Sequence, residues 1–131
     1  MGRDPSHLDS HQHVHQEEPA RSILLDLART LDVPLRHFSA VPYCGEFYGQ
    51  DGKGQPYPQG IRVEALLDIL ARLPPGVTEL ACHPGEGEEL QTMYVRERRE
   101  EIATLCDPRL RAALVSEGIE LCSFRSCPKG G

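Results

Sequence analysis

The chain has 131 residues, 39% of them hydrophobic, which suits one globular domain with a modest core. Its 14 Lys and Arg residues are outnumbered by 20 Asp and Glu residues, giving a formal net charge of −6. This acidic balance, without a dense basic cluster, argues against nucleic acid and anionic membranes as partners. No apolar stretch reaches the roughly 18 to 20 residues of a membrane span, so a cytoplasmic protein is expected.

The N-terminal part predicts a strand, a helix, a second strand and a long loop. HLDSHQHVH at 7–15 alternates with the period of two that is typical of a strand. Pro19 suits the first turn of a helix, which apolar spacing predicts over about 19–32. PLRHF at 34–38 is typical of a short strand, and residues 39–60, with three Pro and five Gly, predict a long ordered loop.

The middle of the chain predicts a helix, a strand and a second helix. The apolar stripe that begins at Val63 predicts a helix that LPPG at 73–76 ends. VTELACH at 77–83 is typical of a strand, and a helix over about 92–105 follows. The mixed charges of RERREE at 96–101 favour a solvated helix face, in which Arg96 and Glu100 lie one turn apart.

The C-terminal part completes an alternation of helices and strands. Asp107 as N-cap and a proline in the next position open a helix that Gly118 closes. IELCSF at 119–124 then predicts a final strand, and residues 127–131 a frayed tail after a single domain over 1–126. Such alternation indicates an α/β fold with a mainly parallel sheet.

The cysteines argue against two kinds of stabilising cross-link. They number five, an odd count, and they form no CxxC pair. Reduced, mostly buried thiols are therefore expected in place of a disulfide framework or a structural zinc site.

The stretch DSHQHVH at 9–15 is a candidate metal site. In an extended strand, His13 and either neighbouring histidine could share one ion, whereas His11 and His15 would lie roughly 13 Å apart. Asp9 lies on the same face, as a direct ligand or as a hydrogen-bond acceptor for an imidazole. The alternative is a surface strand that is merely rich in polar residues.

His83 is a candidate acid or base. It ends the apolar strand ELAC and precedes Pro84 and Gly85, at the carboxyl edge where α/β folds place their active groups. A histidine transfers protons near neutral pH. A structural histidine is the alternative, and the second histidine cluster, also at a predicted strand end, favours function.

Several segments resemble one known family. They are PSHLDSHQHVHQ (5–16), FYGQ (47–50), GVTELACHPG (76–85), YVRERREEIATLCDPRLRAAL (94–114) and GIELCSF (118–124). In this order and at about this spacing they resemble the C-terminal half of the YdjC-like carbohydrate deacetylases, which include chitooligosaccharide deacetylases and hopanoid-associated members.

The resemblance implies a hydrolase that removes acetyl groups from N-acetylated sugars on a (β/α) barrel-like fold, with magnesium or zinc as its divalent metal. By position, it implies that His11 is a metal ligand and that His83 protonates the leaving amine. Asp9, His13 and His15 become supporting or pocket residues. Phe47 and Tyr48 are candidates for stacking on a sugar ring, with core packing as the equal alternative for Phe47.

The resemblance also implies a partial barrel whose N-terminal half is missing. The family's D-D-F-G segment, which supplies a metal ligand and the expected base, has no counterpart here, nor has its next ligand histidine. We therefore expect little or no deacetylase activity from this chain alone. A homodimer or a partner chain would cover the open edge of the half sheet.

Two other functions stay open. PHP-type phosphoesterases also hold metals with alternating histidines, although they need further ligands downstream, where only His37 and His83 remain. The non-enzymatic alternative is a fragment or a sugar-binding module. Translating the DNA upstream of Met1 and searching for a D-D-F-G-like segment would separate a deacetylase fragment from an independent module.

Overall fold

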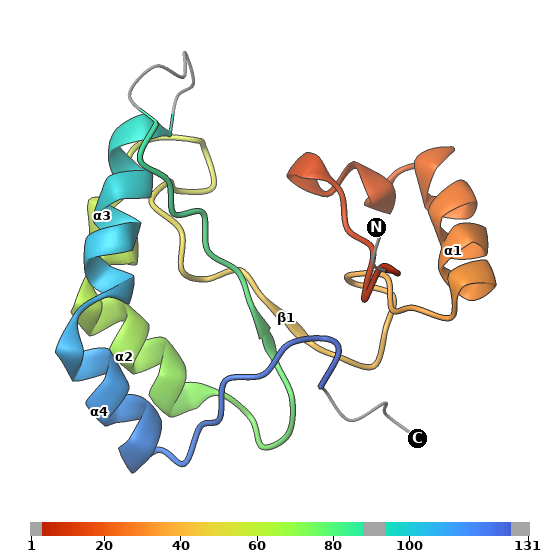
Figure 1. Ribbon diagram of the computed structural model, residues 1–131. Coiled ribbons are helices and arrows are strands. Elements are labelled where there is room, and N and C mark those ends of the chain that lie inside the picture. Colours follow the sequence, from red (N-terminus) through yellow and green to blue (C-terminus); the bar gives the residue numbers. More distant parts are fainter. Residues whose placement is uncertain (1–3, 88–93, 127–131) are drawn as a thin grey trace. The chain divides into compact units, whose positions relative to one another are not determined.

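The computed structural model describes residues 4–87 and 94–126, which form two compact units (Figure 1). The first unit comprises Met1–Tyr43 and Cys122–Gly131, and the second comprises Cys44–Leu121. The sequence predicted one domain over 1–126, and its predicted tail, 127–131, lies outside the described residues. Within the described residues, no helix is long and apolar enough to cross a membrane.

In the first unit, the main helix agrees with the sequence. Helix α1, Ala20–Leu31, has Pro19 as its N-cap residue, and it ends at Asp32, whose backbone is left-handed with φ 51°. The Asp32 N–H donates back to the carbonyls of the last helical turn, which satisfies groups that a helix end otherwise leaves open. The predicted helix over 19–32 is therefore confirmed to within one residue at each end.

The predicted strand over 7–15 is wrong. Residues His11–Gln16 form a 3-10 helix, η1, in which Gln12 and His13 have left-handed φ angles of 52° and 57°. Val14, an apolar residue of this stretch, is 53% exposed. Leu8 is half-buried, but Val14 on the same alternating face is exposed, so the stretch lacks the continuous buried apolar face that normally fixes a strand.

The predicted strand over 34–38 reduces to one bridge. Leu8 and Leu35 form an isolated parallel bridge, in which the Leu8 N–H donates to the Pro34 carbonyl (2.8 Å) and the Arg36 N–H donates to the Leu8 carbonyl (3.0 Å). Leu35 is 2% exposed. This bridge joins the histidine-rich segment to the segment that carries His37.

The second unit has its core between helices. Helix α2, Val63–Arg72, packs against helix α4, Pro108–Ser116 (Figure 1), and both contribute to one apolar cluster. The buried members of this cluster are Phe47, Ile61, Val63, Leu66, Ile69, Leu70 and Leu110. The apolar stripe predicted from Val63 onwards is thus the face that builds this core.

Two short strands complete an α/β arrangement. Strand β1, Tyr43–Cys44, is followed by the 3-10 helix η2, Pro58–Ile61, by α2, and then by strand β2, Glu79–Leu80. The two strands pair in a parallel sheet, and the Ala81 N–H donates to the Cys44 carbonyl at 2.9 Å. The predicted strand over 77–83 is confirmed, although its regular part is only two residues long.

The C-terminal helices agree with their predicted signals. Helix α3, Val95–Leu105, matches the predicted helix over 92–105, of which residues 92–93 lie outside the described residues. The Asp107 carboxylate accepts a hydrogen bond from the Arg109 N–H (2.9 Å), which confirms it as the N-cap of α4. Gly118, with φ 66°, follows the helix end, where glycine tolerates a left-handed backbone.

The predicted final strand over 119–124 is wrong. This segment has no regular structure, and it leads into a turn in which the Ser126 N–H donates to the Ser123 carbonyl (2.9 Å). Leu121 is 78% exposed. A strand needs a neighbour for its backbone groups, and no described segment pairs with this one.

One buried hydrogen bond ties α3 to η2 and gives a test of the core. The Thr104 hydroxyl, on a residue only 6% exposed, donates to the Ile61 carbonyl at 2.6 Å. We expect Thr104→Val to lower the free energy of unfolding by about 1–3 kcal/mol, because the buried carbonyl loses its donor. Urea unfolding followed by circular dichroism measures the change.

Thr30→Val is the matched control for this change. The Thr30 hydroxyl donates to the Asp26 carbonyl at 2.8 Å on an exposed face of α1, where water replaces a lost donor. Its effect is expected to stay within about 0.5 kcal/mol. Equal losses of stability in the two variants would contradict a special role for the buried bond.

Candidate functional sites

Three histidines form a cluster in the first unit. One ring nitrogen from each of His13, His15 and His37 lies within 4.8 Å of the others. His13 and His15 come from η1, and His37, with a left-handed φ of 65°, comes two residues after the bridge at Leu35. The local backbone, rather than a strand, therefore brings the three imidazoles together.

His13 and His37 make the closest pair of imidazoles. The Nε2 atom of His37 lies 3.3 Å from Nδ1 of His13. Two nitrogen ligands with bonds of about 2.1 Å on one tetrahedral or octahedral ion lie about 3.0–3.4 Å apart. The separation of this pair therefore fits two ligands of a single ion, and the donor set suits zinc.

Tyr43 borders this pair. Its hydroxyl lies 3.3 Å from Nε2 of His13, and its ring centre lies 4.5 Å from that of His37. The Arg36 guanidinium lies over the same tyrosine ring at 5.3 Å from its centre. When Nδ1 of His13 has the lone pair needed for a ligand role, Nε2 carries the ring proton and can donate it to the Tyr43 hydroxyl oxygen.

His15 has a structural position. It is fully buried, its Nδ1 lies 2.6 Å from the Ser10 hydroxyl, and its Nε2 lies 3.0 Å from the Arg36 carbonyl. A carbonyl only accepts, so Nε2 carries a proton, and in the neutral ring Nδ1 accepts from Ser10. Binding a metal through Nδ1 would require His15 to lose the Ser10 hydrogen bond.

Asp9 and His11 lie apart from this cluster. The Asp9 carboxylate forms an ion pair with Arg36 at 2.8 Å, so it contacts the segment that also holds His15. His11 is exposed and is not one of the three clustered histidines. The structure thus groups two of the histidines predicted in DSHQHVH and adds His37, while the ligand role of His11 stays a prediction.

His83 lies in the second unit, beside two tyrosines and a buried glutamate. Its ring packs edge-on against Tyr48 (centres 5.1 Å apart) and Tyr94 (5.9 Å), and these two tyrosines stack on each other at 4.9 Å. Glu101 is fully buried, and its Oε1 lies 4.0 Å from Nδ1 of His83. The predicted acid therefore has a carboxylate neighbour.

Of the two predicted sugar contacts, only one has an accessible side chain. Phe47 is 1% exposed and belongs to the apolar core, the alternative that the sequence left open. Tyr48 is half-buried, and its hydroxyl donates to the Gln50 side-chain oxygen at 3.2 Å. The remaining surface of Tyr48 lies next to His83, which is compatible with a sugar contact.

Sequence reasoning missed Tyr94 and Glu101. The Tyr94 hydroxyl donates to Oε1 of Glu101 at 2.7 Å, and burial together with this bond raises the pKa of the phenol far above its ordinary value. Tyr94 and Glu101 are seven residues apart, a spacing that places two residues on one helix face. That spacing was the available signal, although the mixed charges around Glu101 pointed to solvent.

The four cysteines in the described part of the chain are thiols, and three of them are exposed. Cys82, Cys106 and Cys122 are free and exposed, and Cys44 is free and half-buried. The expected reduced state agrees with this for the described residues, whereas the expected burial is wrong. The reason is that three of these residues lie at segment ends or on irregular backbone rather than on the core faces of helices.

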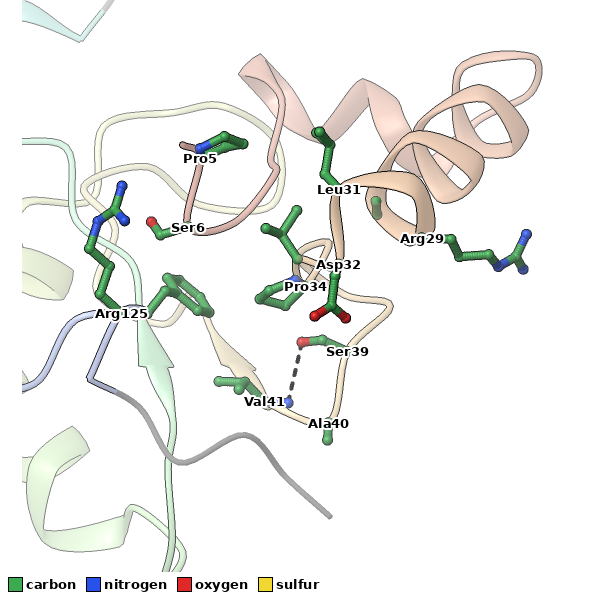
Figure 2. A pocket seen from close by; sticks show the side chains of 13 residues that line it. Pro5, Ser6, Arg29, Leu31, Asp32, Pro34, Ser39, Ala40, Val41 and Arg125 are labelled. Carbon is green, nitrogen blue, oxygen red and sulfur yellow. Dashed lines mark hydrogen bonds between the residues drawn. The ribbon is translucent and has the colours of Figure 1, made fainter. Parts of the chain in front are cut away.

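The first unit also contains an open pocket of about 590 Å³ beside the C-terminal end of α1 (Figure 2). Residues 39–41, Phe124 and Arg125 complete its lining, and the Val41 N–H donates to the Ser39 hydroxyl at 3.3 Å. Neither the three clustered histidines nor any site residue predicted from the sequence lines it. The pocket is therefore separate from the histidine cluster.

The fold and the histidine cluster define an α/β protein with a candidate metal centre built on irregular segments next to a parallel bridge. The chain belongs to the YdjC-like protein family, whose model matches residues 1–116. The family predicted from the sequence motifs is therefore confirmed.

The chain is similar to curated proteins named for one activity. It is 28% identical to a carbohydrate deacetylase of Geobacillus stearothermophilus, covering 95% of this chain and 53% of that protein. It is also 28% identical to a chitooligosaccharide deacetylase of Yersinia pestis (strain Pestoides F), covering 97% of this chain and 54% of the relative. The chain thus spans about half the length of these relatives.

A solved structure supports the α/β fold. It is a protein of Enterococcus faecalis V583 described as a cellobiose-phosphate cleavage protein, with 26% sequence identity and a TM-score of 0.76. The match covers 95% of this chain and 53% of the other. The predicted α/β class is confirmed.

Proposed function

We propose that this chain forms part of a metal-dependent carbohydrate deacetylase that hydrolyses the N-acetyl groups of amino sugars or chitooligosaccharides. The observation that carries the proposal is the 3.3 Å pair of His13 and His37 in a chain of the YdjC-like family. Curated relatives of this chain are named carbohydrate deacetylases, which supports the same reaction class.

The metal would be held by His13 and His37, with His15 as a third ligand if Ser10 releases it, and with His11 as the ligand that the family resemblance implies. Neutral imidazoles suit zinc, whereas magnesium prefers oxygen ligands, so zinc is the metal that this donor set favours. When bound, such an ion polarises the acetamide carbonyl and activates water.

For His83 and Tyr48 we propose the roles that the family resemblance implies. His83, whose side chain is 40% exposed, would donate a proton to the departing amine, and Tyr48 beside it would pack against the sugar ring. A protonated leaving amine departs more readily than an anion, which is why the reaction needs such an acid.

We further propose that the chain alone releases little acetate. Within the described residues, the cluster consists of three imidazoles, and a carboxylate base is not among its members. A metal-bound water without a base and with few fixed ligands reacts slowly. A second copy or a partner chain would supply the remaining groups. A cytoplasmic location remains a prediction from the sequence.

Sugar binding tests the proposed function without requiring turnover. In the presence of zinc, we expect N,N′-diacetylchitobiose to bind at least about 10-fold more tightly than chitobiose, because the acetyl oxygen would contact the ion. Chemical-shift changes in the ring signals of Tyr48 and of the histidines measure this preference.

Tyr48→Ala is the variant that tests the sugar contact, and Tyr57→Ala, at an exposed loop position, is its matched control. Tyr48→Ala should weaken binding and the control should not. Equal binding of the two disaccharides, or no binding of either at millimolar concentration, would contradict the proposal. Rapid acetate release by the chain alone would contradict the expected low activity.

A second candidate function follows from the solved relative. Its description names a phosphorylated disaccharide, and it shares 26% identity and the fold with this chain. Cellobiose phosphate in the same binding experiment separates the two functions. Tighter binding of this ligand than of the diacetylated sugar would favour the second candidate.

A further inference from the structure

Glu101 is a buried carboxylate whose two oxygens are both occupied. Oε1 accepts from the Tyr94 hydroxyl at 2.7 Å, and Oε2 accepts from the backbone N–H of His83. Burying an ionised carboxylate is costly unless hydrogen bonds compensate, and these two donors supply that compensation. The fold therefore holds a fixed negative charge next to His83.

The position of this charge is set by tight packing. The Tyr94 hydroxyl accepts a hydrogen bond from the Gly49 N–H at 2.6 Å. A Cβ atom at Gly49 would lie 2.9 Å from the same hydroxyl, closer than real Cβ atoms approach other atoms. The two hydrogen bonds that link Gly49 to Tyr94 and Tyr94 to Glu101 thus leave the carboxylate little freedom to move away from His83.

The imidazole of His83 faces this charge with one particular nitrogen. Nδ1 is a buried atom 4.0 Å from Oε1 of Glu101, although the side chain as a whole is 40% exposed. The exposed surface of the side chain therefore lies on its other atoms. At this distance there is no hydrogen bond, but the charge of the carboxylate favours a proton on Nδ1 and the protonated form of the ring.

We propose that Glu101 is a positioning residue that keeps a proton on Nδ1 of His83 and raises the pKa of the ring, so that Nε2 is the nitrogen that exchanges protons with a ligand. This rests on the proposed function only in giving His83 the role of an acid. Among the described residues, the rings of Tyr48 and Tyr94 pack against His83, and Cys82 precedes it in the chain. The Arg98 guanidinium lies 5.9 Å from the Tyr94 ring centre and opposes the effect of Glu101.

The experiment is a pH titration of the ¹⁵N-labelled chain, followed by long-range ¹H–¹⁵N spectra of the imidazoles. The His83 signals are assigned by their loss in His83→Asn. In the unmodified chain, we expect neutral His83 to carry its proton on Nδ1. Its pKa should fall by about one pH unit or more in Glu101→Gln, which removes the charge at nearly constant shape.

Glu100→Gln is the matched control, since Glu100 is the adjacent residue, is less buried than Glu101 and pairs with the exposed Arg96. It should leave the His83 pKa within about 0.3 pH units of its original value. Tyr94→Phe disturbs the same packing but keeps the carboxylate charge, so the His83 pKa should stay at least as high as in the unmodified chain.

Two results would overturn the proposal. The first is an Nε2–H tautomer of His83 in the unmodified chain, which needs no variant to fold. The second is an equal shift of the His83 pKa in Glu101→Gln and Glu100→Gln. None of these measurements uses metal or sugar, so a failure of the deacetylase proposal and a failure of this one are distinguishable.

Discussion

Replacing Phe47 with Ala is expected to lower the free energy of unfolding by about 3–5 kcal/mol. The ring is 1% exposed and packs in the cluster formed by η2, α2 and α4, so its removal leaves a cavity that fixed helices cannot close. Urea unfolding followed by circular dichroism measures the loss. Phe47→Leu, which retains most of the apolar volume, should cost less than half as much.

Phe38→Ala is the matched control, because Phe38 is 41% exposed and loses much less buried area on truncation. It should cost under about 1.5 kcal/mol. A small effect of Phe47→Ala, comparable with that of the control, would contradict the core position. It would also restore Phe47 as a candidate sugar contact, so this stability measurement bears on the binding site.

The helices were predictable because their signals are local. The apolar stripe from Val63, the N-cap at Asp107 and the helix after Pro19 each depend on residues within a few turns of one another. These three helices can therefore be predicted without knowledge of the rest of the fold, and all three are present in the structure.

The strands were less predictable because a strand depends on its partner. The predicted strands at 34–38 and 77–83 contribute only one and two paired residues, and that at 119–124 contributes none to the described sheet and bridges. A single sequence states which residues favour an extended backbone, but the neighbour that accepts their hydrogen bonds lies far away in the chain. Pairing is therefore where prediction failed.

Residues of the two candidate sites were also predictable only where a local sequence pattern marks them. His13 and His15 belong to the alternating pattern of DSHQHVH. His37 lies near them because of the bridge at Leu35, and no local sequence pattern predicts that bridge. In α3, Arg96 and Glu100, which the sequence placed one turn apart, form an ion pair at 2.8 Å. Glu101, the next residue, turns inwards, because one step along a helix rotates a side chain by about 100°.

Removing either member of the imidazole pair is expected to reduce the zinc affinity of the chain on the order of 100-fold. His13→Ala and His37→Ala each delete one of the two nitrogens that lie 3.3 Å apart, so a single imidazole of the pair would remain. Competition with a chromophoric chelator at pH 7 measures the affinity. Circular dichroism checks that the variants keep their helices.

The chain offers graded controls for this loss. His7→Ala removes a histidine that stacks on Phe124 and is not in the cluster, so zinc affinity should not change. His15→Ala also removes the bonds to Ser10 and to the Arg36 carbonyl, and it should lower stability as well as affinity.

A loss of zinc affinity in His11→Ala as large as that in His13→Ala would add His11 as a ligand, as the family resemblance implies. Unchanged affinity in both His13→Ala and His37→Ala would refute the metal centre, because zinc would then be bound by atoms outside the pair whose spacing fits it.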